Sequence, residues 1–290
     1  MRLPAFVPLA VMALATSGGC SEGGAHEQDA RLGDGGDASR GAIGPSDAAA
    51  RSTQSTDGAA DDARACAQPP ELPMVGLTQY DRTTANNCDL PWPVDNLYAA
   101  ASSSEYDMGL LGPSGACGRC LQLTGPTGLT ATLAVVDQCP TASNPKCANG
   151  HLDLSPQAYA ALVPANYPSG GEVVNGASNA SWKYAPCPVS GPIVYHFKDG
   201  TNPYWIAVQV RNSRLGIKAI RYLTASGGWA DAGPPTDSLA YFVITGWGSN
   251  AISLQVVDES GRTLQDDNLP FAANGDVPGH AQFPSCPLAP

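Results

Sequence analysis

The chain has 290 residues, of which 43% are hydrophobic and only 14% are charged, and its formal net charge is −11. This acidity argues against nucleic acid as a partner, because phosphate backbones are bound by clustered lysine and arginine. The 32 glycines and 26 prolines favour many short strands and turns over long helices, and the length leans toward two domains.

The first predicted element is an export signal over residues 1–20. Arg2 is followed by an apolar run, residues 3–15, which is too short to span a membrane. Cys20 follows two glycines, a layout similar to a bacterial lipoprotein processing site, although Ser17 stands where that pattern usually has leucine. We therefore predict that the protein is secreted. The alternative is that it stays at the cell surface, anchored by a lipid attached to Cys20.

Residues 21–65 are predicted to be a disordered acidic linker. They contain almost no large apolar side chain, so they cannot bury enough surface to offset the entropy lost on ordering. Nine acids against four arginines give this segment a net charge of −5, nearly half of the total. The rest of the chain is therefore only mildly acidic.

Residues 66–188 are predicted to form a first domain, which holds seven of the nine cysteines. A strand is expected at residues 130–137, with Leu133, Val135 and Asp137 on one face. A helix is expected over SPQAYAALV, residues 155–163, where Ser155 is the natural N-cap and Pro156 the first helical residue.

Two carboxylates of this domain are candidates for acid–base chemistry or for binding. Alternation directs Leu152 and Leu154 to the core and leaves Asp153 facing away from it. Glycoside hydrolysis usually needs two carboxyl groups, and Asp137, at the end of an apolar strand, is the second that the folded sheet could bring near. Each of the two could instead stabilise a turn by accepting hydrogen bonds from nearby backbone N–H groups.

Residues 189–290 are predicted to form a second domain, and the cysteine count falls to one there. Apolar and polar residues alternate over residues 204–212, 217–223, 239–246 and 251–259, with turn residues between these segments. This pattern predicts a small antiparallel β-sandwich.

The cysteines favour a structural disulfide framework. Setting Cys20 aside leaves eight, enough for four disulfides, and one unpaired thiol is the alternative. The CGRC segment at residues 117–120 is also compatible with a redox or zinc motif, but the sequence has no second such pair and no histidine at ligand spacing. We predict no metal and no cofactor, and spacing alone leaves the connectivity open.

Seven segments in a fixed order carry a family resemblance: GLTQYD (76–81), NNCDLP (86–91), CGRCLQLTGPTG (117–128), AVVDQCP (134–140), LDLSPQAY (152–159), YWIAVQVRN (204–212) and VPGHAQFP (277–284). Together they resemble the expansins, and specifically the bacterial expansin-like proteins. The resemblance implies a mostly β fold, a six-stranded double-psi β-barrel followed by an immunoglobulin-like β-sandwich. It also implies cellulose binding and wall loosening without hydrolysis, by a barrel similar to that of family 45 endoglucanases.

The resemblance implies a polar groove in the barrel made of Thr78, Tyr80, Asp137 and Asp153. Asp153 matches the general acid of the related hydrolases, whose base lies two residues after the tyrosine of the T-x-Y segment. Arg82 occupies that position here. Asp81 is one residue short, and such a shift along a strand turns a side chain to the opposite face unless a bulge re-aims it. We therefore expect Asp153 to hold a glucan rather than to cut it.

In the second domain the resemblance implies an aromatic platform with Tyr204 and Trp205, and Lys198 as a nearby polar contact. The third ring of the platform aligns near Leu239, so either Tyr241 takes over the stacking role or the platform is shorter. Strict alternation places Tyr204 on the side of Ile206. Both rings are exposed only if the strand starts irregularly after Pro203, and core packing of Tyr204 is the alternative.

Similarity to the plant expansin barrel also implies a disulfide pairing. It joins Cys88 to Cys117, Cys120 to Cys187 and Cys139 to Cys147, and leaves Cys66 with Cys286.

We predict a monomeric, secreted protein that is not an enzyme and that binds cellulose and related cell-wall glucans, disrupting their non-covalent contacts. Nucleic acid is not expected, and a membrane only through the lipid anchor. One alternative is a weak endoglucanase, or a lytic transglycosylase acting on peptidoglycan, with Asp153 as acid. Another is a pure carbohydrate-binding adhesion module. The second domain has eight acids and six bases, a balance that favours neutral glucans over acidic polymers.

Overall fold

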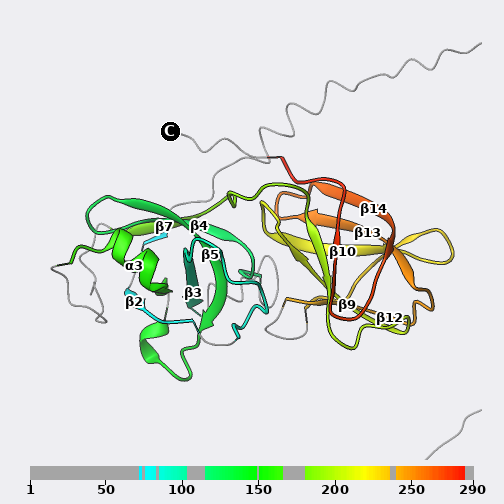
Figure 1. The fold of residues 1–290 in the computed structure, drawn as a ribbon, viewed down its shortest axis with the longest axis horizontal. Coiled ribbons are helices and arrows are strands. Elements are labelled where there is room, and N and C mark those ends of the chain that lie inside the picture. The colour runs from blue at the N-terminus through cyan, green and yellow to red at the C-terminus, as the bar shows by residue number, and fades with distance from the viewer. Residues whose placement is uncertain are drawn as a thin grey trace, which may run out of the picture. The chain divides into compact units, whose positions relative to one another are not determined.

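The computed structural model describes residues 72–73, 76–82, 85–102, 115–148, 150–165, 180–235 and 240–284 (Figure 1). The predicted signal peptide with Cys20, the predicted linker and the predicted pair Cys66–Cys286 lie outside these residues. Within the described ranges, no helix is long and apolar enough to cross a membrane.

The first sheet is mixed, and its strand order in the described part of the chain is β1-β7-β4-β5-β3-β6-β2. The strands, cyan to green in Figure 1, are β1 (Leu72–Pro73), β2 (Leu77–Gln79), β3 (Tyr98–Ser102), β4 (Cys120–Thr124), β5 (Thr130–Cys139), β6 (Leu152–Leu154) and β7 (Ser181–Ala185). β2 runs parallel to β6 and β3 parallel to β5, whereas the other pairs are antiparallel. Apart from the two-residue edge strand β1, this is the predicted six-stranded barrel sheet, which is confirmed.

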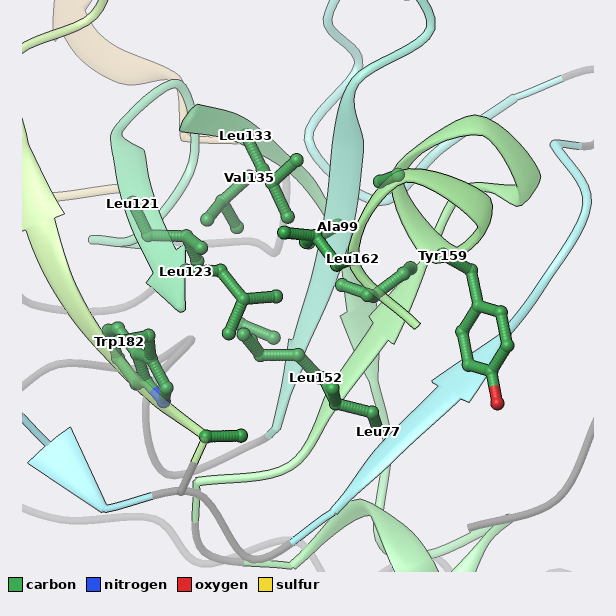
Figure 2. Close-up of a cluster of buried hydrophobic side chains, with 14 of the residues drawn as sticks. Leu77, Ala99, Leu121, Leu123, Leu133, Val135, Leu152, Tyr159, Leu162 and Trp182 are labelled. Carbon is green, nitrogen blue, oxygen red and sulfur yellow. The ribbon is translucent and has the colours of Figure 1, made fainter. Parts of the chain in front are cut away.

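The barrel core is built by alternate residues of these strands, as strand geometry requires. Leu121 and Leu123 of β4, Leu133 of β5 and Leu152 of β6 are fully buried and pack together with Trp182 of β7 (Figure 2). The inward residues are apolar, while residues between them carry the polar side chains. The face of each strand opposite to the core is therefore the one available for a functional site.

The helix α3 (Pro156–Leu162) follows β6 as predicted. The Oγ of Ser155 accepts a hydrogen bond from the backbone N–H of Ala158, and Pro156 occupies the first turn, where its missing N–H costs nothing. Tyr159 and Leu162 bury one side of the helix against the barrel core. A short 3-10 helix, η1 (Pro145–Cys147), precedes β6.

Strand β5 contains a bulge, and the bulge overturns one expectation. The register pairs Ala99 with Val135 but Ala100 with Asp137, so the residue between them, Val136, has no partner on β3. An extra residue reverses the alternation beyond it. Asp137 therefore points to the face opposite to Leu133 and Val135, and the prediction that the three share one face is wrong.

The second part of the chain contains two antiparallel four-stranded sheets, which confirms the predicted sandwich. One sheet has the order β11-β10-β13-β14 and the other β12-β9-β8-β15. The strands, yellow-green to red in Figure 1, are β8 (Val194–Phe197), β9 (Trp205–Arg211), β10 (Ile217–Leu223), β11 (Trp229–Asp231), β12 (Phe242–Thr245), β13 (Ala251–Asp258), β14 (Thr263–Pro270) and β15 (Gly275–Pro278). Strand β13 alternates buried and half-buried residues along its length, which is the pattern of a sheet with one face in a core.

The two hydrophobic cores lie on either side of the predicted boundary at residues 188 and 189, since one uses residues 77–184 and the other residues 193–283. Polar contacts join the two parts. Gln209 Nε2 donates to the carbonyl of Cys88 at 2.7 Å. Arg119 forms an ion pair with Glu259 and places its guanidinium 3.3 Å from the ring centroid of Tyr184. Burial raises the pKa of Glu259 although this guanidinium opposes the shift.

Among the described residues, the structure has the disulfides Cys88–Cys117, Cys120–Cys187 and Cys139–Cys147. The family resemblance implies the same three pairs. The two cysteines of CGRC are therefore bonded to different partners and not to each other. Each covalent link closes a loop and lowers the entropy of the unfolded chain.

Candidate functional site

A row of side chains crosses four neighbouring strands on the face of the barrel sheet opposite to the core. The register aligns Thr78 of β2 with Asp153 of β6, Asp153 with Ala100 of β3, and Ala100 with Asp137 of β5. Residues aligned across a sheet point to the same face. We call Thr78, Asp153, Ala100 and Asp137 the polar row. The two acids stand on either side of a small alanine, two interstrand spacings or roughly 10 Å apart between their Cα atoms.

Asp153 faces away from the core, as predicted, since Leu152 and Leu154 are fully buried on the other face of β6. Its side chain keeps 17% of its surface exposed. One carboxylate oxygen, Oδ1, lies 3.3 Å from Nε2 of His151, and the other, Oδ2, lies 3.0 Å from Sγ of Cys139. That sulfur is in a disulfide and has no hydrogen to donate, so Oδ2 receives no hydrogen bond from it.

His151 is a site residue that the sequence analysis missed. Its Nε2 lies 2.7 Å from Oγ1 of Thr78 as well as 3.3 Å from Asp153, and its side chain is 1% exposed. The ring is packed so closely on Gly76 that a Cβ at that position would come within 2.8 Å of Nδ1. The signal was present in the sequence, because a residue two positions before Asp153 in a strand lies on the same face.

Asp137 makes the turn contacts that were considered for it, and its functional role stays a prediction. Its Oδ1 accepts hydrogen bonds from the backbone N–H groups of Asn87 and Gln138, each at 2.9 Å, so the carboxylate does stabilise a local turn. It also lies in the polar row. Burial raises the pKa of Asp137, the charge of Asp153 adds to the rise, and the two N–H donors oppose it. The site therefore contains a carboxyl group that holds its proton more tightly than an exposed aspartate.

Replacing Asp137 by asparagine is expected to remove a pH-dependent loss of stability. The folded-state pKa of Asp137 is raised above the ordinary value of 3.8, so the wild type loses stability as pH rises from that value to the raised one. The unfolding free energy of the variant relative to wild type should increase over this window and then level off. Thermal unfolding of both proteins from about pH 3 to about pH 7 measures the difference.

The matched control for this titration is Asp199→Asn, which removes an exposed carboxylate that contacts only its own turn among the hydrogen bonds described. If the unfolding free energy of Asp137→Asn relative to wild type decreased as the pH rises, the raised pKa of Asp137 would be contradicted.

Tyr80 lies beside the polar row. Its hydroxyl is buried and has no hydrogen-bond partner among the described residues. Burial raises the pKa of Tyr80, and the charges of Asp137 and Asp153 contribute further. The ring packs against Ala100 and the Cys139–Cys147 disulfide. A buried donor without a partner is costly to the folded state.

The position expected for a hydrolytic base carries no carboxylate. Strand β2 ends at Gln79, and Asp81 and Arg82 follow it as exposed residues. The backbone N–H of Arg82 donates to the hydroxyl of Tyr98 at 3.1 Å, and its Nη1 donates to Oδ1 of Asn96 at 3.3 Å. Arg82 is thereby committed to structural contacts.

The ligand atoms of Cys139, His151 and Asp153 all lie within 4.8 Å of one another, which is a geometry compatible with a metal ion. The chemistry of the donors does not fit, because metals bind a cysteine as its thiolate and Cys139 is in a disulfide. Two remaining ligands are too few for a closed site. The prediction of no metal stays a prediction.

Tyr204 and Trp205 are both exposed, Tyr204 by 75% and Trp205 by 36%. The reason is a turn: Asn202 and Trp205 exchange backbone hydrogen bonds of 2.9 and 3.1 Å, with Pro203 and Tyr204 between them. Tyr204 therefore precedes strand β9 and escapes its alternation. This is the irregular start that exposure of both rings requires, and core packing of Tyr204 does not occur.

Tyr241 does not present a ring to a ligand, and the prediction that it binds substrate is wrong. It is 1% exposed, and its hydroxyl donates to Oδ2 of Asp89 at 2.6 Å. It lies on the outer face of the sheet, opposite to Phe242, but at the end that the barrel residue Asp89 covers. Lys198 places Nζ 4.7 Å from the Tyr241 ring centroid, and its role as a ligand contact stays a prediction. Leu239 lies outside the described residues.

The outer face of β9 joins the two parts of the site. Ile206, Val208 and Val210 point into the sandwich core, so Trp205 and Gln209 share the outer face. Gln209 contacts the barrel through the carbonyl of Cys88, and Trp205 at the other end of the strand stays exposed. One sheet face is therefore covered by the barrel at one end and displays an aromatic ring at the other.

No family model matches the chain. Expansin-YoaJ of Bacillus subtilis is 29% identical over 201 residues, which are 67% of this chain and 78% of that protein. The crystal structure of the Clavibacter michiganensis expansin superposes with a TM-score of 0.59 at 27% identity, over 74% of this chain and 98% of that one. A variant of that expansin in complex with cellohexaose gives 0.61 at 26% identity with the same coverage. The match runs through the barrel and the sandwich, and the chain is similar in sequence and in fold to expansin-like proteins of the bacterial type.

Proposed function

We propose that this protein binds cellulose or a related cell-wall glucan and loosens non-covalent contacts between chains without hydrolysing them. The observation that carries the proposal is a polar row containing two acids together with two exposed aromatic rings, Trp205 at the start of β9 and Tyr204 in the turn before it. A similar expansin has been crystallised with cellohexaose, which supports a glucan as the ligand.

The two parts of this surface suit different features of a glucan. Aromatic rings pack on the apolar faces of sugar rings, and rings exposed on a sheet suit a flat chain better than an enclosed pocket does. Hydroxyl groups of the sugar can donate to Asp153, whose side chain is 17% exposed. Binding of this kind competes with the hydrogen bonds that hold neighbouring glucan chains together.

Hydrolysis is disfavoured because Arg82 occupies the position where the related hydrolases have their catalytic base. An inverting glycosidase needs an acid and a base on opposite sides of the scissile bond. Arg82 replaces the base, and Asp81 is exposed beyond the end of β2. Asp137 is the other acid of the row, but one of its oxygens is held by two backbone N–H groups. Among the described residues, the position expected for the base therefore carries no carboxylate.

The N-terminal sequence supports a secreted protein, with Cys20 as a lipid attachment point and the acidic segment as a tether. We propose a monomer with the domain boundary near residue 188, in line with the separate hydrophobic cores. Peptidoglycan is the alternative polymer.

The test of this function applies the purified protein to cellulose and to isolated plant walls under constant load, and records wall extension, protein bound to cellulose and soluble sugar. Extension and binding without sugar release are expected. Sugar release in proportion to extension would instead show a hydrolase, and binding without extension would show an adhesion module. Release of anhydro-muropeptides from peptidoglycan would show a lytic transglycosylase.

A further inference from the structure

We propose that Trp92 is a sugar-stacking residue that extends the polar row along the same face of the barrel sheet, with a neutral glucan chain as its ligand. The proposal rests on the proposed function, because it adds a contact for the same polymer. Trp92 lies in the segment 92–96, between the NNCDLP motif and strand β3, and neither the motifs nor the polar row assign a role to this segment.

The first step concerns the face of the sheet. Tyr98 and Ala100 are two residues apart in β3, so they point to the same face, while Ala99 and Ala101 point into the barrel core. Ala100 is a member of the polar row. Tyr98 therefore lies on the face of the row, displaced along the strand by roughly 7 Å.

The second step concerns the rings that cover Tyr98. Tyr80 meets it edge to face with centroids 5.5 Å apart, and Trp92 packs on it at 4.8 Å with a tilt of 56°. Tyr98 is 2% exposed, whereas Trp92 is only half-buried. The rings of Tyr80, Tyr98 and Trp92 thus form a continuous stack that begins beside the polar row. Trp92, at the end of this stack, still exposes part of its surface to a ligand lying along this face.

The third step concerns rigidity. Pro91 and Pro93 flank Trp92 and fix their own backbone φ angles. The backbone N–H of Asn96 donates to the carbonyl of Pro93 at 3.0 Å, and the carbonyl of Asn96 accepts from Oγ of Ser155 at 2.6 Å. A ring held in this way loses little freedom when a ligand binds, which favours affinity.

The fourth step concerns Arg82. Its backbone N–H donates to the hydroxyl of Tyr98, and its guanidinium donates to Oδ1 of Asn96. The residue that stands in place of a catalytic base thus ties the end of the Trp92 segment to the aromatic stack. Of these two contacts, only the one from the guanidinium depends on the arginine side chain, and it supports the segment that holds Trp92.

The experiment measures cellohexaose affinity in a protein whose sandwich rings are removed by Tyr204→Ala and Trp205→Ala, so that only barrel binding remains. Adding Trp92→Ala should weaken binding roughly 3- to 10-fold, the range expected for one aromatic contact. The matched control is Leu129→Ala, which removes another exposed apolar side chain of the barrel and should leave affinity unchanged.

A second measurement does not depend on how well the Trp92→Ala protein folds. The indole N–H signal of Trp92, identified in the NMR spectrum by its loss in Trp92→Phe, should shift when cellohexaose is added to the protein lacking the sandwich rings. A Trp92 signal that stays in place while the barrel binds cellohexaose would overturn the proposal and show that Trp92 only covers Tyr98.

The failure of this proposal can be told apart from that of the proposed function. If the barrel binds cellohexaose but Trp92→Ala does not weaken that binding, only the role of Trp92 is contradicted. A cooperative thermal unfolding transition shows that the protein is folded. If such a protein does not bind cellohexaose through the barrel, both this proposal and the part of the proposed function assigned to the polar row are contradicted.

Discussion

Asp153→Asn is expected to reduce wall extension roughly tenfold or more, since it removes the charge that strengthens hydrogen bonds to sugar hydroxyls. The amide keeps the size of the side chain, and Leu152 and Leu154 keep β6 anchored in the core, so the fold should be retained. Binding to cellulose should change little, because the exposed rings Tyr204 and Trp205 are untouched. Extension under load, measured beside cellulose binding, tests this separation.

The control for Asp153→Asn is Asp81→Asn, which removes the carboxylate nearest in sequence to the expected base position. It should leave extension unchanged and release no sugar. If wild type releases soluble sugar and Asp81→Asn stops it, Asp81 acts as a base despite its position after the end of β2, and the non-hydrolytic function is refuted.

Replacing both Tyr204 and Trp205 by alanine is expected to weaken cellulose binding roughly 10- to 100-fold, since two aromatic contacts of about 1 kcal/mol each, with the apolar area they bury, are lost. Both side chains are already exposed, Tyr204 in a turn and Trp205 at the start of β9, so stability should change little. Pull-down on insoluble cellulose measures the binding, and thermal unfolding measures the stability.

Trp229→Ala is the aromatic control for the platform. Trp229 is half-buried on β11, in the sheet that does not contain β9. It should leave cellulose binding unchanged. Equal losses in Trp229→Ala and in the double variant would show that binding follows general loss of aromatic surface rather than this platform.

Features that depend on neighbouring residues were predictable from the sequence. Ser155 and Pro156 begin a helix because their own chemistry satisfies the first turn, and alternation around Asp153 separates Leu152 and Leu154 from the acid. The strands of the sandwich follow for the same reason. Each of these signals is contained in fewer than ten residues, so no knowledge of the rest of the fold was needed.

Features that depend on pairing between distant strands were harder to predict. The bulge at Val136, which turns Asp137 onto the face of Asp153, arises only when β5 meets β3. Tyr241 has the alternation of an outer-face residue, and only the approach of Asp89 from the barrel shows that this end of the face is covered. His151 was missed although alternation alone places it on the face of Asp153, and its contact with Thr78 depends on the parallel pairing of β2 with β6.

The pairing of β6 has a mechanical consequence. This strand has three residues, yet it is hydrogen-bonded on one side to β2 and on the other to β3. Tension in a polymer chain attached to Asp153 would pass through the side chain into a strand supported on both sides and backed by Leu152 and Leu154 in the core. Pulling on such an interior strand must strain two sets of hydrogen bonds together, whereas an edge strand peels from one. If Asp153 binds a wall polymer as proposed, force on that polymer is carried by a strand that is hydrogen-bonded on both sides.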